Sequence, residues 1–211
     1  MSDPLVSVVL PFFNRSNSIR TAAESMIDQT YRNIEVILVN DGSEDESEKV
    51  CSDLTAKDRR VRLINLPVNA GVGFARSVGV KIAAGNYIAT MDSDDISYPD
   101  RLYKQVNYME EHNDISVSGG NAVKISNGIK REMKMAKADS RLKALLLHID
   151  RTFIHPTTIF RKSFLDENAL NYCGGRITDD DYDLYARCLA RGAKFGNIDD
   201  VLIVYIRHPN N

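Results

Sequence analysis

The first 120 residues alternate between short β-branched runs and longer stretches with helical periodicity, and this rhythm restricts the fold more than any other feature. We expect strands at 6–10, 34–39, 61–65, 87–91 and 115–119, separated by helices at 18–29, 45–57, 73–84 and 98–112. Strands joined by helices pair in parallel, and the helices cover both faces of the sheet. The pattern therefore predicts an α/β protein with a Rossmann-like, mostly parallel central sheet. Ser43, three residues before Glu46, is the expected N-cap of the second helix.

The rhythm changes after Gly120. Residues 123–133 predict a hairpin around Asn127-Gly128, and the remaining pattern predicts a helix at 139–148, a strand at 157–160, a helix at 181–190 and a strand at 201–206. No internal repeat, low-complexity segment or sharp linker divides the chain. We therefore expect a single domain of residues 1–211, in which 1–120 form a nucleotide-binding half and 121–211 a smaller acceptor-side subdomain.

Composition excludes several classes of protein. The net charge of −2 provides no basic field for nucleic acid. No stretch approaches the ~20 apolar residues of a spanning helix, and the N-terminus lacks the basic region of a secretory signal. Three cysteines, Cys51, Cys173 and Cys188, lack zinc-like spacing and suit reduced thiols. We expect a cytoplasmic protein, and leave open a peripheral contact with the inner membrane face and a homo-oligomer.

The strand expected at 87–91 runs directly into three carboxylates, Asp92, Asp94 and Asp95. Acids this close repel one another, so the arrangement favours a ligand that offsets their charge. Mg2+ and Mn2+ take oxygen ligands and usually share their coordination shell with substrate phosphates. A solvated loop is the alternative. Since α/β sheets bind ligands outside the carboxyl ends of their strands, the motif predicts a divalent cation at that edge.

The same edge should carry Asn14, Asp41 and Asn69, which follow the first three strands. Asp41 suits a base imide or a ribose hydroxyl, although an Asp-Gly turn into the next helix explains it equally well. The segment Pro11-Phe-Phe-Asn14 offers a ring for base stacking, unless one or both phenylalanines belong to the core. Arg76 can bind a phosphate through two hydrogen bonds or form a surface salt bridge.

A second acid cluster, Thr178-Asp-Asp-Asp-Tyr-Asp183, precedes the helix expected at 181–190. Acids there stabilise the helix dipole, which is one reading of the cluster. The other reading is a general base for an incoming hydroxyl group, placed beside a metal-bound nucleotide. His155 and His208 are isolated histidines, and isolated histidines are more often structural than catalytic.

Taken in order, these segments resemble the family 2 glycosyltransferases, which have the GT-A fold. The resemblance covers nearly the whole chain and is carried by Val6–Asn14, Gln29–Asp45, Asn69–Gly71 with Arg76, Met91–Asp95 with Pro99–Arg101, and Asp180–Leu184. It implies a nucleotide-sugar donor, usually linked to UDP, in a nucleotide-sugar-binding half at 1–120. It also implies transfer with inversion to a hydroxyl group of a glycan or lipid-linked acceptor, in polysaccharide or cell-surface glycan biosynthesis.

The resemblance also assigns roles to residues around the donor. It implies that Asp41 binds the uracil, that Phe13 stacks on it, and that Arg76 lies near the base or diphosphate. Asp92 would lie near the ribose and Asp94 on Mn2+ or Mg2+. It extends the donor site to Pro11, Asn14, Asn69 and Ser93. It also implies that Asp92 and His208 are metal ligands beside Asp94.

The general base of the family is the aspartate of a Glu-Asp pair that opens a helix. Asp180 stands where the glutamate is usual, so the resemblance implies that Asp181 is the base, with Asp179 and Asp180 as alternatives. Relatives often read Tyr-Arg-X-His near the end of the domain, whereas this chain reads Tyr205-Ile-Arg-His208, and the role of Arg207 stays open.

Three other functions remain to be weighed. A non-catalytic nucleotide-sugar-binding module has no need of Asp181. A nucleotidyltransferase needs a glycine-rich phosphate loop after its first strand, which Pro11–Arg15 lacks. An aspartyl-phosphate phosphatase usually places its Asp-X-Asp motif after the first strand, whereas Asp92 follows the fourth.

Overall fold

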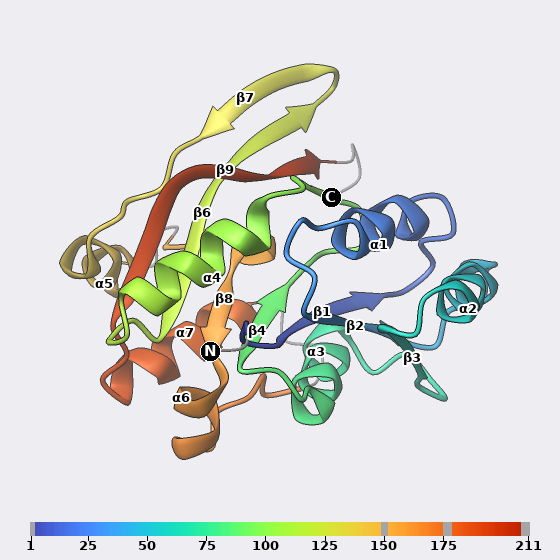
Figure 1. The fold of residues 1–211 in the computed structure, drawn as a ribbon, viewed down its shortest axis with the longest axis horizontal. Coiled ribbons are helices and arrows are strands. Elements are labelled where there is room, and N and C mark those ends of the chain that lie inside the picture. The colour runs from blue at the N-terminus through green and yellow to red at the C-terminus, as the bar shows by residue number, and fades with distance from the viewer. Residues whose placement is uncertain (1–2, 149–151, 175–178, 208–211) are drawn as a thin grey trace.

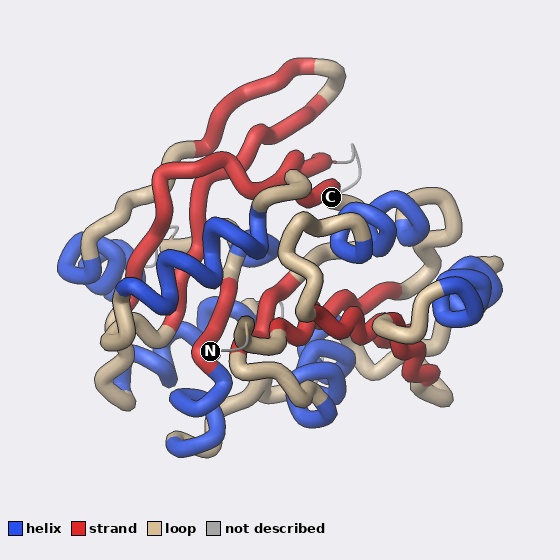
Figure 2. Tube along the Cα trace, in the orientation of Figure 1, coloured by secondary structure: helices blue, strands red, loops and turns tan. Residues whose placement is uncertain are grey.

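The computed structural model describes residues 3–148, 152–174 and 179–207. Its strands lie in one curled sheet, with helices on both sides (Figures 1 and 2). The strands are β1 (Val6–Phe12), β2 (Ile34–Asn40), β3 (Val61–Asn65), β4 (Tyr87–Thr90), β5 (Ile96–Ser97), β6 (Val117–Ser126), β7 (Ile129–Met133), β8 (Ile159–Arg161) and β9 (Phe195–Arg207). The helices are α1 (Ile19–Ile27), α2 (Ser47–Lys57), α3 (Val72–Ile82), α4 (Arg101–Glu111), α5 (Asp139–Leu147), α6 (Lys162–Glu167) and α7 (Asp180–Ala190), with a 3-10 turn η1 (His155–Thr157).

Within the described residues the strand order is β3-β2-β1-β4-β8-β6-β9-β5, with β7 paired to β6. The first four strands in this order pair in parallel, as the alternation of strands and helices predicts. β8 lies antiparallel between β4 and β6, and so joins the second half of the chain to the first. The predicted α/β fold is confirmed, and the second half adds the antiparallel pairs.

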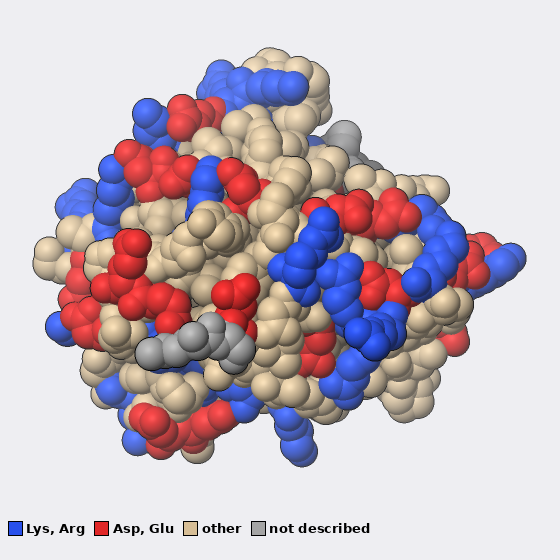
Figure 3. All heavy atoms as spheres, viewed as in Figure 1, with Lys and Arg blue, Asp and Glu red and all other residues tan. Residues whose placement is uncertain are grey.

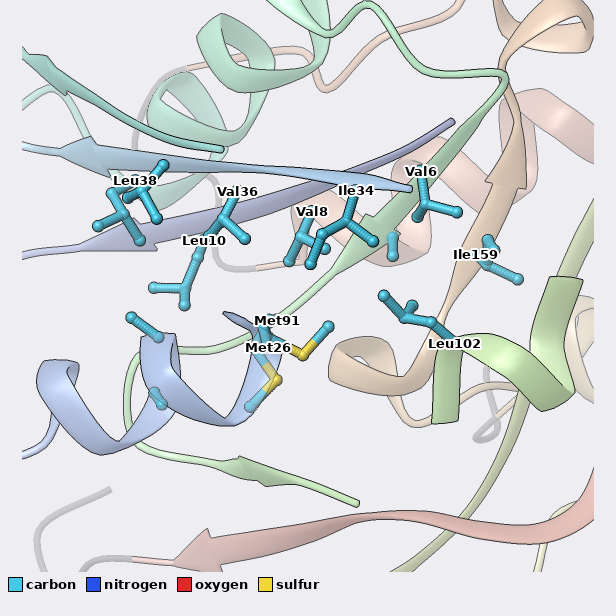
Figure 4. Close-up of a cluster of buried hydrophobic side chains, with 14 of the residues drawn as sticks. Val6, Val8, Leu10, Met26, Ile34, Val36, Leu38, Met91, Leu102 and Ile159 are labelled. Atoms are coloured by element: carbon cyan, nitrogen blue, oxygen red, sulfur yellow. The ribbon is translucent and has the colours of Figure 1, made fainter. Parts of the chain in front are cut away.

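Alternate residues of β1 pack on opposite faces of the sheet. Val8 and Leu10 point toward α1, α2 and α4, where they meet Met26 and Leu102 (Figure 4). Full burial of an aliphatic side chain of this size stabilises a fold by about 1.5–3 kcal/mol. This apolar layer therefore holds three helices on one face of the parallel strands.

The opposite face of β1 and β2 packs against α3, and α7 belongs to the same apolar cluster. Val9 and Val39 lie there in one cluster with Val80 and Leu184. A Cβ atom at Gly79 would lie 2.5 Å from Cγ1 of Val9, which is closer than a real contact allows. Only glycine at this position lets α3 approach β1 so closely. That approach fixes how far Arg76, one helical turn earlier in α3, lies from the sheet.

Two strands of the second half differ from the expectation. β6 continues to Ser126 instead of ending near 119, and β9 begins at Phe195 instead of Val201. β9 includes the mostly polar segment Asn197–Asp200, and its pairing with β6 shifts register between Gly119 and Ala122. A polar, irregular stretch shows no alternation of apolar residues, so sequence periodicity missed it.

Smaller elements also differ. β5 spans two residues held by β9, and α6 spans six, so neither gives a periodic signal. The expected N-cap at Ser43 is wrong, because α2 begins at Ser47. The Ser43 hydroxyl instead accepts a hydrogen bond from the Asn14 N–H at 3.0 Å. Among the described residues no helix combines the length and apolar character that a membrane span requires.

Candidate functional site

The carboxyl ends of β1 and β2, the turn before α3 and the acid turn after β4 enclose a cavity of about 430 Å3, here called the first cavity. This is the edge of a parallel sheet where α/β proteins bind ligands. Eight residues predicted for the donor or its metal line the cavity: Pro11, Phe13, Asp41, Asn69, Arg76, Asp92, Ser93 and Asp94. Tyr205, from the segment Tyr205-Ile-Arg-His208, also lines it, as do Arg15 and Val72, which no sequence signal singled out.

The two phenylalanines at the end of β1 differ in exposure. Phe12 is buried among the apolar side chains beneath α1, although it also contributes to the lining of the first cavity. Phe13 is 39% exposed and lines the first cavity. An exposed ring at a cavity wall offers a flat apolar surface on which a planar group can stack. The structure therefore resolves the alternative that the sequence left open between these two rings.

The carboxylate of Asp41 shapes the turn that precedes α3. Its Oδ1 accepts the Ala70 N–H at 2.8 Å, and its Oδ2 accepts the Gly71 N–H at 2.9 Å. Gly71 has φ 96°, in the left-handed region that favours glycine. A carboxylate oxygen accepts two hydrogen bonds, so each oxygen of Asp41 keeps acceptor capacity for a ligand. Asp41 thus fixes one wall of the first cavity while lining it.

Asn14 does not line the first cavity, contrary to the prediction that it contacts the donor. Its side-chain oxygen accepts the Glu44 N–H at 2.9 Å, and its own N–H donates to Ser43. Asparagine tolerates the φ of 51° found here better than most residues. Asn14 therefore joins the loops that follow β1 and β2, and supports the site from outside.

Arg76 joins the two acid clusters. Its Nη1 donates to both carboxylate oxygens of Asp180, at 2.9 and 3.0 Å, and its Nη2 donates to Oδ1 of Asp92 at 2.9 Å. Burial alone would lower the pKa of Arg76, but the carboxylates of Asp92 and Asp180 raise it above its ordinary value. The guanidinium is thus charged, and its Nη1 and Nη2 atoms donate to carboxylates. In this arrangement the two nitrogens do not make the bidentate contact with a phosphate that the sequence predicted.

A second cavity, of about 580 Å3, adjoins the first. The two share Val72, Arg76, Asp92 and Tyr205 as lining residues. Asp180, Asp181 and His155 line the second cavity alone. The acid turn after β4 and the acid cluster that opens α7 therefore face two connected spaces, which meet at the Arg76–Asp92 ion pair.

The three neighbouring aspartates at the start of α7 have different surroundings. Asp180 is buried and bound to Arg76, whereas Asp179 precedes the helix and is exposed. Asp181 accepts the Tyr182 N–H through Oδ1 at 2.8 Å, and its Oδ2 lies 4.0 Å from Nδ1 of His155. Burial raises the pKa of Asp181 above its usual range. Of the three, Asp181 is the carboxylate that lines the second cavity without accepting a hydrogen bond from Arg76.

His155 is buried beside Asp181 with hydrogen bonds to two tyrosines. Its Nδ1 lies 2.7 Å from the hydroxyl of Tyr185, and its Nε2 lies 3.2 Å from the hydroxyl of Tyr172. Burial, and then the charge of Arg76, hold the pKa of His155 well below its usual range, so the ring is neutral. A neutral ring does not neutralise the neighbouring carboxylate. The sequence classed His155 as an isolated histidine because Asp181 is distant in the chain.

Asp92 and Asp94 are the carboxylates of the first cavity that suit a divalent cation. No group of three or more His, Cys, Asp and Glu side chains positioned to hold a metal occurs among the described residues. His208, the third predicted ligand, lies outside the described residues. Two carboxylates fit a hard cation such as Mg2+, which completes its shell with water and substrate phosphates.

The third acid of the turn after β4, Asp95, lines neither cavity. Asp95 is buried, and its Oδ1 accepts the Ile206 N–H at 2.8 Å. Its Oδ2 has no hydrogen-bond partner among the described residues. Burial, followed by the charge of Asp92, raises the pKa of Asp95 to about 8. Asp95 therefore ties β9 to the acid turn, mostly as a neutral acid at neutral pH.

Comparisons with known proteins agree with this geometry. The family model described as glycosyl transferase family 2 matches residues 7–169. A glycosyltransferase of Methanocaldococcus jannaschii is 33% identical over 214 residues, covering 100% of this chain and 73% of the relative. Glycosyltransferase GlyG of Streptococcus pneumoniae is 31% identical over 222 residues, covering 98% of this chain and 72% of the relative.

Solved structures share the fold at lower identity. TarS 1–349 of S. aureus in complex with UDP-GlcNAc superposes with a TM-score of 0.83 at 20% identity, covering 98% of this chain and 59% of that chain. A mannosyltransferase of Pyrobaculum calidifontis in complex with GDP-Man and Mn2+ gives a TM-score of 0.71 at 17% identity, covering 98% and 57%. This chain therefore spans less than two thirds of the length of these solved chains.

Proposed function

Because this chain belongs to the family 2 glycosyltransferases, we propose that it moves a sugar from a UDP-linked donor to a hydroxyl group of a glycan or lipid-linked acceptor, with inversion at the anomeric carbon. The observation that carries this proposal is the meeting of two cavities at Arg76 and Asp92. Inversion requires donor and acceptor on opposite sides of one carbon atom, and two joined cavities provide that arrangement.

The first cavity suits the nucleotide. Phe13 offers a ring for the base, and Asp41 offers acceptor capacity for the base imide. Asp92 lies where the two cavities meet, and Asp94 lines the first cavity. UDP and UDP-GlcNAc in the TarS structures, and GDP-Man in the mannosyltransferase, support a nucleotide-sugar donor.

A divalent cation fits the acid turn. We assign Mn2+ or Mg2+ to Asp92 and Asp94, and the Mn2+ in the mannosyltransferase structure supports this assignment. When bound, such a cation neutralises the charge that develops on the departing diphosphate. Arg76 holds the Asp92 carboxylate in place through Nη2 and so orients one of the two ligands.

The second cavity suits the acceptor, and Asp181 is the proposed general base. As the acceptor oxygen bonds to the anomeric carbon, the bond from that carbon to the diphosphate oxygen breaks, and Asp181 accepts the hydroxyl proton. Burial raises the pKa of Asp181, so its carboxylate is a stronger base than that of an exposed aspartate. Asp180 is a weaker candidate because both of its oxygens accept hydrogen bonds from Arg76.

A donor screen tests this function. The protein is incubated with UDP- and GDP-linked sugars, with Mn2+, Mg2+ or a chelator, and with a mixture of glycan acceptors. We expect release of UDP, faster with metal and with acceptor, and an anomeric configuration opposite to that of the donor. UDP binding without consumption of any donor would favour the alternative of a non-catalytic nucleotide-sugar-binding module. Retention of configuration would contradict Asp181 as a base in an inverting reaction.

We propose that the reaction takes place in the cytoplasm and serves polysaccharide or cell-surface glycan biosynthesis.

A further inference from the structure

One face of strands β7, β6 and β9 carries three cationic side chains. Lys124 on β6 lies directly opposite Arg131 on β7, and Ser126 lies opposite Arg207 on β9. Side chains alternate along a strand, so Lys124 and Ser126 point to the same face, as do their cross-strand partners. Lys and Arg side chains gather at the end of the molecule formed by the β6–β7 hairpin (Figures 1 and 3).

None of these three cations forms an ion pair with a carboxylate of the described residues. Like charges placed directly opposite each other on neighbouring strands destabilise a sheet. The pair of Lys124 and Arg131 therefore opposes folding, and no ion pair with a described carboxylate relieves the repulsion. Local arrangements that oppose folding occur mainly where function requires them, because a ligand supplies the missing interaction.

This cationic face forms part of the second cavity. Lys124 and Arg207 line that cavity together with Asp181. Lys124 also lines a smaller hollow of about 240 Å3 on the hairpin, which it shares with Arg131. The positive side chains thus extend from the neighbourhood of the proposed base outward along the hairpin. A ligand whose hydroxyl group reaches Asp181 passes beside them.

The donor diphosphate does not explain this face. Lys124, Arg131 and Arg207 are absent from the lining of the first cavity, where Arg15 and Arg76 are the arginines. A flat anionic membrane does not explain it either, because Lys124 and Arg207 line a cavity. Lys130 points to the opposite face of the hairpin.

We propose that the acceptor carries an anionic group, a phosphate or a carboxylate, close to the hydroxyl group that receives the sugar. Lys124 binds that group, with Arg207 in the lining of the same cavity and Arg131 opposite Lys124 on the hairpin. The inference rests on the proposed function, since it takes the second cavity as the acceptor site. It makes these cations specificity-determining residues that select charged acceptors over neutral ones.

Binding to the UDP-saturated protein tests this inference. The probes are two matched pairs, N-acetylglucosamine 1-phosphate with N-acetylglucosamine and glucuronic acid with glucose, measured by calorimetry or ligand-observed NMR at low salt. We expect at least one anionic probe to bind about tenfold tighter than its neutral partner, with the difference falling as salt rises. Comparison of the two pairs distinguishes a phosphate from a carboxylate.

The double variant Lys124→Gln/Arg131→Gln should remove most of this preference and keep the affinity for UDP. Lys130→Gln is the matched control, because it removes a neighbouring charge from the other face of the hairpin. Equal affinity for charged and neutral probes in a protein that binds UDP would overturn this inference and leave the proposed function standing. So would an equal loss in Lys130→Gln, which would indicate a general surface charge effect. Failure of the wild-type protein to bind UDP would instead contradict the proposed function.

Discussion

Arg76 and Asp180 lie 104 positions apart in the chain, yet Nη1 of Arg76 is 2.9 and 3.0 Å from the two carboxylate oxygens of Asp180. The contact joins α3, at the first cavity, to α7, which carries Asp181. A Cβ atom added at Gly73 would lie 3.0 Å from Oδ2 of Asp180, so α7 also approaches α3 closely. This buried pair sets where the proposed base stands relative to the nucleotide-binding edge.

Asp180→Asn should destabilise the protein by about 3 kcal/mol, because it leaves a buried guanidinium with one carboxylate partner instead of two. The measurement is chemical denaturation near neutral pH. Asp183→Asn, on the same helix, is the control. It removes a partly exposed pair with Arg187, which contributes less than about 1 kcal/mol. Equal losses in the two variants would contradict a structural role for the Arg76–Asp180 contact.

Asp181→Asn should fold normally, bind UDP as well as the wild-type protein, and transfer sugar about 100-fold more slowly. The asparagine amide cannot accept the proton of the acceptor hydroxyl. The measurements are UDP affinity and the rate of glycosyl transfer, with Asp179→Asn as the exposed neighbouring control. Turnover at the wild-type rate in Asp181→Asn would place the base elsewhere.

The pH dependence of transfer follows from the environment of Asp181. A general base acts when it is deprotonated, so kcat/KM should fall as the pH falls through the pKa of this carboxyl group. Because burial raises that pKa, the fall should begin at a higher pH than it would for an exposed aspartate. A profile of kcat/KM against pH checks this expectation. A flat profile through the acidic range would contradict it.

Asp94→Asn should weaken metal-assisted UDP binding by about tenfold and leave metal-independent binding largely unchanged, since it replaces one of two proposed carboxylate ligands. Calorimetry with UDP, in Mn2+ and in chelator, makes the comparison. Asp45→Asn is the control, because its carboxylate accepts the N–H groups of Ser16 and Ser47 and does not line the first cavity. If Mn2+, chelator and Asp94→Asn all gave one affinity, the metal assignment would fail.

Asp95→Asn should change the pH dependence of stability. Burial raises the pKa of Asp95 from 3.8 to about 8 in the folded state, so the folded state binds the proton more tightly than the unfolded chain. The stabilisation is complete below the unfolded pKa and is lost as pH rises toward about 8. Relative to Asp95→Asn, the wild-type protein should therefore lose unfolding free energy between pH 4 and 8.

Asp45 provides a control of opposite sign for this measurement. Hydrogen bonds involving Ser47 and Ser16 outweigh its burial and lower its pKa from 3.8 to about 2. Its contribution is present above the unfolded pKa and is lost as pH falls toward about 2. Denaturation of Asp45→Asn should therefore differ from wild type in the acidic range in the opposite direction. Parallel stability curves for Asp95→Asn and the wild-type protein would show that Asp95 is not protonated in the fold.

Much of the first half was predictable because β1, β2 and β4 are buried along nearly their whole length. The expected strands at 34–39 and 61–65 end within one residue of β2 and β3, since segments rich in Val, Ile and Leu and bounded by polar turns mark them. The carboxyl-edge location of Asp41, Asn69, Asp92 and Asp94 followed from parallel pairing alone. The bend of β9, with its polar residues, depended on pairing with β6, which periodicity does not report.

The sequence by itself determined the family, the parallel half of the sheet and the edge at which its acids gather, because these depend on local periodicity and on the order of short motifs. Only the tertiary structure decided which titratable side chains lie beside one another. Asp180 faces Arg76, Asp181 faces His155, and Lys124 lies opposite Arg131, although each pair except the last is more than 20 positions apart. Such contacts depend on how α7 and the β6–β9 strands pack against the parallel sheet. That packing is a property of the whole core, and no segment of the chain encodes it alone.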